Sequence, residues 1–223
     1  MSEKKRILNQ IINNSDNSIS DRDIEDAILE PLMEELDIIK DPSVSSFVRS
    51  MLLKADTFWK IPGSFTSVYH PPDEDNEYGN ILHTKRVVRI ALIMCDNYFF
   101  SNLEIDLIIA ACILHDITKG VQEDEECISY DEFHPYTVDS FYRKAKRHDL
   151  LLSETQSSVM LLEDELVEKI LRIIRCHEGS RSSIPETRPT SAEEVILANA
   201  NSLASKLHWI IDGDEIRIDR WLL

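Results

Sequence analysis

The stretch AACILHDITKG, residues 110–120, is the most informative in the chain. A run of small and apolar residues ends there in His115 and Asp116, with Lys119 one helical turn further on. Upstream, Ser101 and Glu104 have the spacing of a capping box, which marks a helix N-terminus. The sequence therefore predicts a buried helix from about Ser101 to His115. The polar pair at its end is either a satisfied buried pair or part of a metal site.

The composition is that of an acidic protein with enough apolar residues to fold. The 223 residues are 43% hydrophobic and carry a formal charge of −17. Long nucleic acid is not an expected partner, because phosphate contacts need a basic surface. A small basic pocket inside an acidic shell stays compatible with this charge. Only 5 residues are glycine, which argues against Gly-rich phosphate loops and a turn-rich fold.

Cysteine usage and hydropathy predict a cytoplasmic protein. The four cysteines form no Cys-x-x-Cys pair, and three lie in apolar helical stretches, where we expect them to be reduced. The N-terminus is basic but has no apolar signal-peptide region. No run approaches the 18 apolar residues of a membrane span. We therefore expect neither export nor a membrane partner.

Helical periodicity extends over most of the chain and predicts an all-α fold. Residues 61–80 are the exception, since their prolines and glycines prevent regular structure. This loop is either a linker or a functional segment, and the two readings are compatible. The expected organisation is an N-terminal helical extension (1–57), a helical core (58–210) and a C-terminal tail (211–223), with a short strand in the tail. The expected helices are 4–14, 20–40, a restart at Asp41-Pro42, 80–96, 101–115, 134–146, 163–177 and 191–210.

Four of the seven histidines are predicted to lie on helices or at their ends: His83, His115, His134 and His177. Each alone is more typical of a structural residue. As a set, with Asp116 adjacent, they offer the imidazole and carboxylate ligands that a borderline divalent metal prefers. Sequence spacing does not establish that they converge in space.

The order of these motifs resembles the HD-domain superfamily of metal-dependent phosphohydrolases, over roughly residues 58–208. The resemblance implies an HD-domain-like helical bundle. The matching stretches are FWKIPGSFTSVYHP (58–71), GNILHTKRVV (79–88), AACILHDITKG (110–120), EFHPY (132–136), IRCHEG (174–179) and PTSAEEVILANANSLAS (189–205).

The resemblance also implies a ligand set of one or two divalent ions: Mn, Fe, Co, Ni or Zn. The ligands of the first ion would be His83, His115, Asp116 and Asn201. Asp116 would bridge to a second ion held by His134 and His177, and a metal-activated hydroxide would attack the phosphoester. Asn201 departs from the family pattern, which has aspartate there, so its oxygen brings no charge and binding should weaken.

Catalytic and substrate roles are also expected for residues near these motifs. Asp116 and Lys119 are the expected catalytic residues, and Lys119, Arg86 and His70 the expected substrate contacts. Lysine suits a phosphate as a point charge, whereas the alternative for each basic residue is an ordinary surface ion pair. A small phosphorylated substrate, a nucleotide or short oligonucleotide, fits the acidic chain best.

Two other functions stay open at this level. A catalytically weak HD domain would act as a nucleotide-binding or protein-interaction module, and Asn201 favours it. The N-terminal helices would then supply a partner or homodimer surface. A di-iron oxygenase would use similar ligands, although the basic residues near the motifs weigh against it.

Overall fold

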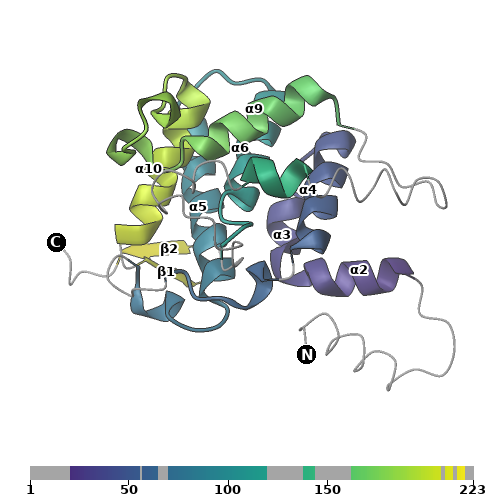
Figure 1. The fold of residues 1–223 in the computed structure, drawn as a ribbon. Coiled ribbons are helices and arrows are strands. Elements are labelled where there is room, and N and C mark those ends of the chain that lie inside the picture. The colour runs from purple at the N-terminus through teal and green to yellow at the C-terminus, as the bar shows by residue number, and fades with distance from the viewer. Residues whose placement is uncertain are drawn as a thin grey trace, which may run out of the picture.

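The computed structural model describes residues 21–55, 57–64, 70–119, 138–143, 162–206, 209–212 and 215–218. In these ranges helices form the core, which confirms the predicted all-α class (Figure 1). The helices are α2 (Asp21–Leu29), α3 (Met33–Leu36), α4 (Pro42–Lys54), α5 (Gly79–Cys95), α6 (Asn102–Leu114), α9 (Asp164–Arg175) and α10 (Ala192–Lys206). The 3-10 turns are η1 (Glu30–Leu32), η2 (Phe58–Lys60), η3 (Pro72–Glu74), η5 (Gly179–Arg181) and η6 (Pro185–Thr187), and residues 138–143 are also helical.

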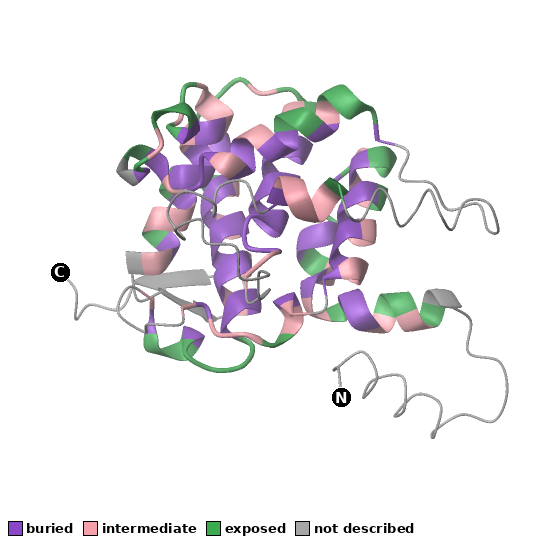
Figure 2. Ribbon diagram, in the orientation of Figure 1, coloured by how far each residue is buried: buried purple, intermediate pink, exposed green. Residues whose placement is uncertain are grey.

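Helix α6 lies at the centre of the bundle and contacts α4, α5, α9 and α10. Every residue from Asp106 to Leu114 is buried (Figure 2), as expected of a helix that is apolar on all sides. The predicted capping box is confirmed: Glu104 N–H donates to Ser101 Oγ at 3.3 Å, and Ser101 N–H donates to Glu104 Oε2 at 2.7 Å. The cap and the burial of α6 together fix the position of His115, the residue that follows α6.

Helices α5 and α10 pack against each other along one side of α6. Their packing brings together residues that are more than a hundred positions apart in the sequence. The beginning of α5 and the middle of α10 meet near the C-terminal end of α6. This meeting point contains most of the predicted ligands.

The N-terminal helices pack on the same core. Leu29, Leu36 and Phe47 belong to the hydrophobic cluster that includes α6. The predicted continuous helix over 20–40 is wrong, because η1 interrupts it around Pro31, which has no backbone N–H to continue a helical ladder. The predicted restart at Asp41 is confirmed, since its side chain caps α4. The division of the chain at residue 57 stays a prediction.

The C-terminal segment differs from its prediction. The helix expected to reach residue 210 ends at Lys206. Strand β1 (Trp209–Asp212) then pairs antiparallel with β2 (Glu215–Ile218), which confirms a strand in the tail. Among the described residues, no helix combines the length and apolar character needed to span a membrane. Three free cysteines, Cys95, Cys112 and Cys176, are buried.

Candidate metal centre

His115 presents an imidazole nitrogen inside the bundle that makes no hydrogen bond with the described residues. Its Nδ1–H donates to the carbonyl oxygen of Cys112 at 2.8 Å. Because a carbonyl only accepts, the proton lies on Nδ1 and the neutral ring keeps its Nε2 lone pair free. Nε2 is buried and has no hydrogen-bond partner among the described residues. Burial, partly opposed by Asp116, lowers the pKa of His115 to about 3, so the ring is neutral and ready to act as a ligand.

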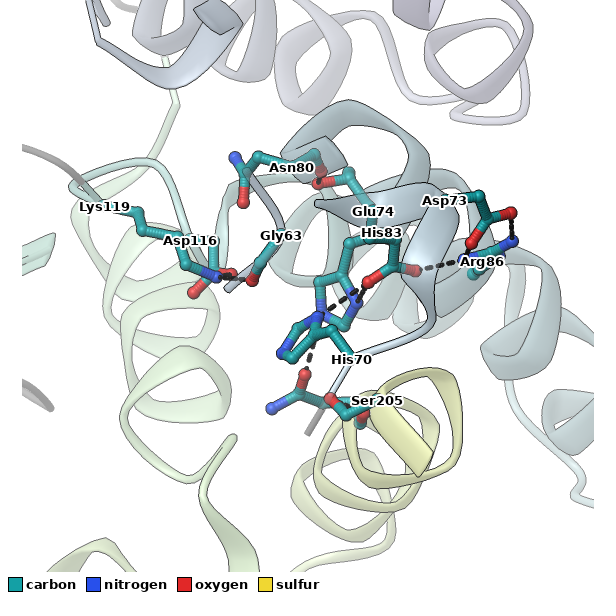
Figure 3. A network of polar contacts seen from close by, with 12 residues as sticks. Gly63, His70, Asp73, Glu74, Asn80, His83, Arg86, Asp116, Lys119 and Ser205 are labelled. Atoms are coloured by element: carbon teal, nitrogen blue, oxygen red, sulfur yellow. Dashed lines mark hydrogen bonds and ion pairs between the residues drawn. The ribbon is translucent and has the colours of Figure 1, made fainter. Parts of the chain in front are cut away.

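Asp116 supplies a buried carboxylate beside this nitrogen. Its Oδ2 lies 3.6 Å from His115 Nε2 and 2.6 Å from Lys119 Nζ. Burial alone would raise the pKa of Asp116, but Lys119 and the nearby histidines outweigh it and hold that pKa well below its ordinary value. Lys119 also donates to the carbonyl oxygen of Gly63 at 2.5 Å. Lys119 therefore ties the loop after η2 to the ionised Asp116 (Figure 3).

His83 and Asn201 complete the group from α5 and α10. Donor atoms of His83, His115 and Asp116 all lie within 4.8 Å of one another. Asn201 Oδ1 lies 3.0 Å from His83 Nε2, while Asn201 Nδ2 donates to the carbonyl oxygen of His177 at 3.3 Å. The second bond orients the amide so that its oxygen faces His83. The structure thus brings together all four residues predicted for the first metal ion.

His177 lies next to His115, with 5.7 Å between the ring centroids. Its Nδ1–H donates to the carbonyl oxygen of Ile174 at 2.7 Å, the same arrangement that His115 has at the end of α6. Gly179 follows with φ 67, a left-handed conformation that glycine adopts without strain. His134, the other ligand expected for a second ion, lies outside the described residues.

A family model for the HD domain matches residues 80–206, more than half of the chain. The chain belongs to the HD-domain superfamily. Members of this superfamily are mostly metal-dependent hydrolases and generally bind divalent metals. The match spans every predicted metal ligand in this HD domain. Neither a search of curated proteins nor a search of solved structures found a significant match.

The HD-domain site also contains a buried carboxylate that the sequence did not single out. Glu74 is fully buried, and its Oε2 lies 2.7 Å from His70 Nδ1 and 3.3 Å from His83 Nδ1 (Figure 3). His70, Glu74 and His83 form a second group with donor atoms within 4.8 Å of one another. Glu74 is one of several acids in the Pro-rich loop, and nothing in that run distinguishes it. Only its contacts do.

Arg86, expected to contact substrate, is engaged elsewhere in this structure. It is 2% exposed and lies in ion pairs with Asp73 and Glu74, the Glu74 contact being 2.5 Å long. The Arg86 side chain therefore faces Glu74 and not the group around Asp116 (Figure 3). His70 does lie next to the site, since its ring centroid is 4.6 Å from that of His83.

The side chains present fit a divalent transition metal. The HD-domain group offers imidazole nitrogens, one carboxylate and one amide oxygen, a mixture that suits Mn, Fe, Co, Ni or Zn better than Mg. Both His115 and His177 donate Nδ1–H to a backbone carbonyl, the outer-shell arrangement usual for metal-binding histidines. The buried Nε2 of His115, which has no hydrogen-bond partner in the described part of the chain, is the clearest sign that a ligand belongs here.

Proposed function

We propose that this HD domain is a metal-dependent phosphohydrolase that cleaves a phosphoester or phosphodiester bond of a nucleotide or short oligonucleotide. One observation carries the proposal. The His115 Nε2 atom is buried and lacks a hydrogen-bond partner among the described residues, donor atoms of His83, His115 and Asp116 lie within 4.8 Å of one another, and Asn201 contacts His83. A buried polar atom left unsatisfied costs about 1–3 kcal/mol. A folded protein is expected to retain such an unsatisfied atom where the atom binds a ligand.

Four residues would hold the first ion: His83, His115, Asp116 and Asn201. His177, together with His134, would hold a second ion, and Asp116 would be shared between the two. A divalent ion at such a site supplies charge neutralisation at the phosphoryl oxygens and lowers the pKa of water. The protein would supply the scaffold that orients these ligands, because α6 is buried up to the residue before His115.

Lys119 would act mainly through Asp116. Its Nζ lies 2.6 Å from Asp116 Oδ2, so it holds that carboxylate ionised and oriented. A phosphate contact by Lys119 would add to this role, since an ammonium has three donors. His70 borders the site and would contact substrate through its remaining ring nitrogen. Arg86 would contribute by holding Glu74.

A small substrate is supported by charge. The chain has a formal charge of −17, so a long polyanion would be repelled by most of the surface. A mononucleotide or short oligonucleotide would need only the few positive groups at the site. A cytoplasmic location is consistent with free buried thiols.

A second candidate function is a catalytically weak HD domain that binds a nucleotide or a protein. Asn201 favours it, because an amide oxygen brings no negative charge to the metal and should weaken binding. In this case the ligand geometry would be kept while turnover is lost.

Metal analysis combined with a substrate screen tests the proposal. The purified protein would be analysed for bound metal and assayed with phosphomonoesters, phosphodiesters and nucleoside triphosphates under Mn²⁺, Co²⁺ or Ni²⁺. Bound metal with hydrolysis supports the enzyme. Bound metal without hydrolysis of any substrate supports the binding module. No bound metal and no hydrolysis would overturn both the metal site and the enzyme.

A further inference from the structure

Glu74 is the most completely enclosed carboxylate near the candidate site. It ends η3, upstream of the HD-domain match, and its side chain is 0% exposed. Oxygen Oε1 accepts from Arg86 at 2.5 Å, and Oε2 faces His70 Nδ1 and His83 Nδ1. Glu74 is therefore a charged group in the interior.

Two glycines and one arginine fix the position of Glu74. Gly63 N–H donates to the Glu74 carbonyl oxygen at 2.8 Å. A Cβ at Gly79 would lie 1.7 Å from the same oxygen, and a Cβ at Gly63 would lie 2.8 Å from Glu74 Oε2. Arg86 bonds both Asp73 and Glu74. The backbone and the carboxylate are held from three sides, so Glu74 has little freedom to move away from His83.

His83 lies between two oxygen acceptors. Its Nε2 makes a hydrogen bond of 3.0 Å with Asn201 Oδ1, whereas its Nδ1, 3.3 Å from Glu74 Oε2, has no aligned hydrogen bond among the described residues. A neutral imidazole carries one proton and can satisfy only one of them. The carboxylate is the stronger acceptor because it is charged. Were the proton on Nδ1, facing Glu74, the lone pair of Nε2 would face the Asn201 oxygen. A cation bound by both atoms would remove this contact between two acceptors.

We propose that Glu74 is a positioning residue that keeps the proton of His83 on Nδ1 and so presents Nε2 to a divalent transition metal. This inference rests on the metal site of the proposed function. It adds a residue outside the matched HD domain. Removing an outer-shell partner of a metal-binding histidine typically lowers metal affinity about 10- to 100-fold, which sets the expected size of the effect.

The other reading of these contacts is a separate cation held by His70, Glu74 and His83. That cation would require Nδ1 of His83 as a ligand, while Nε2 faces Asn201 on the other side. It would also lie beside the Arg86 guanidinium, whose positive charge already pairs with Glu74 at 2.5 Å. Both features favour the positioning role, and metal stoichiometry distinguishes the two.

The experiment compares the full-length protein with Glu74→Gln and Glu74→Ala, using two measurements. Nitrogen-15 NMR of the histidine side chains in metal-free protein reports which His83 nitrogen is protonated. Titration with Co²⁺ or Mn²⁺ reports affinity and stoichiometry. We expect a protonated Nδ1 in the unchanged protein, a shift of the proton toward Nε2 in Glu74→Ala, and an affinity loss of about 10- to 100-fold. Glu74→Gln should fall between, because its amide oxygen still accepts.

Glu194→Gln is the matched control, since Glu194 is also a buried glutamate paired with an arginine, Arg172 at 2.9 Å. It should leave the His83 proton and the metal affinity unchanged. If Glu74→Ala does not fold because Arg86 has lost one of its two carboxylate partners, the double variant Glu74→Gln with Arg86→Met removes both buried charges and should show the intermediate proton shift expected of Glu74→Gln.

The outcomes separate this inference from the proposed function. An unchanged His83 proton, or unchanged affinity in every Glu74 variant that binds metal, overturns the positioning role and leaves the metal site standing. An extra metal equivalent that disappears in His70→Ala overturns it in favour of the separate cation. Failure of the unchanged protein to bind any metal would overturn the proposed function itself.

Discussion

Asn201 Oδ1 lies 3.0 Å from Nε2 of His83, although the two residues are 118 positions apart in the sequence. The contact exists because α5 and α10 pack side by side. It places the one residue that departs from the family pattern directly against a predicted metal ligand. The amide is therefore at the site, and its effect on metal binding can be measured.

Replacing Asn201 by aspartate should tighten metal binding. An added unit charge about 4 Å from a divalent ion contributes on the order of 1–2 kcal/mol even at the dielectric of water, or about tenfold in affinity. Calorimetric titration with Mn²⁺ or Co²⁺ measures it. Asn199→Asp is the control. Asn199 is exposed on the same helix, and its replacement by aspartate changes the net charge of the protein by the same amount. Weaker binding in Asn201→Asp would mean that Asn201 does not serve as a ligand.

Asp116→Ala should abolish metal binding while the fold persists. The substitution removes the only carboxylate among the four proposed ligands of the first ion and leaves Lys119 bonded to Gly63. We expect the metal affinity to fall by more than about 100-fold, which is the upper end of the loss seen when an outer-shell partner of a metal ligand is removed. Metal content by mass spectrometry and helicity by circular dichroism check the two parts. Unchanged metal content would contradict the ligand assignment.

Gly79→Ala should destabilise the fold strongly. The added Cβ would lie 1.7 Å from the carbonyl oxygen of Glu74, and backbone cannot give way as a side chain can. Overpacking of this kind typically costs about 1–3 kcal/mol or more, measured as a fall in the free energy of unfolding in urea. Ile93→Ala, on the exposed side of the same helix, should change that free energy by less than about 0.5 kcal/mol. Equal stability of the two variants would rule out the close approach.

Asp106→Ala should loosen the attachment of the N-terminal helices. The buried carboxylate accepts the backbone N–H of Lys40 at 3.1 Å and that of Asp41 at 2.7 Å. Losing the acceptor for these donors should lower the free energy of unfolding by about 1–3 kcal/mol. Hydrogen exchange would show faster exchange at Lys40 and Asp41. Unchanged protection at those amides would contradict the link between α6 and the start of α4.

Glu194 should contribute stability that is lost at acid pH. Burial alone would raise its pKa, but the Thr190 N–H and Arg172 outweigh it and lower that pKa below 4.5. A carboxyl with a lowered pKa stabilises the fold above its ordinary pKa, and the contribution disappears as pH falls through the lowered value. The stability difference between the protein and Glu194→Gln should therefore be largest near about pH 7 and shrink below pH 4.5. A difference independent of pH would contradict this assignment.

Local signals predicted most of the helices. Ser101 and Glu104 cap α6 as expected, and Asp41 caps α4, because capping depends on residues a few positions apart. Pro31 is the local signal that ends the helix predicted over 20–40, since η1 interrupts it there. The end of α10 could not be placed, because residues 209–212 pair with residues 215–218, and strand pairing competes with helix only once the chain has turned back on itself.

The candidate site likewise contains residues that the sequence predicted and residues that it did not. His83, His115, Asp116, His177 and Asn201 were predicted from motif order, and the structure places them around one point. Glu74 and the buried position of Arg86 were not predicted, since neither follows a local pattern. From the sequence alone, an acidic residue in a loop is expected to be exposed to solvent, and only the structure shows that Glu74 is buried.

The sequence by itself determined the helical class and the buried α6, because side-chain type and periodicity are local properties, and its resemblance to the HD-domain superfamily supplied the candidate histidine and carboxylate ligands. Tertiary structure decided which polar groups meet. The packing of α5 against α10 brings Asn201 to His83. Gly63 and Gly79 leave room for Glu74 in the interior, because a Cβ at either position would lie too close to Glu74 atoms. Such contacts depend on the free energy of packing distant segments, which no short stretch of sequence contains.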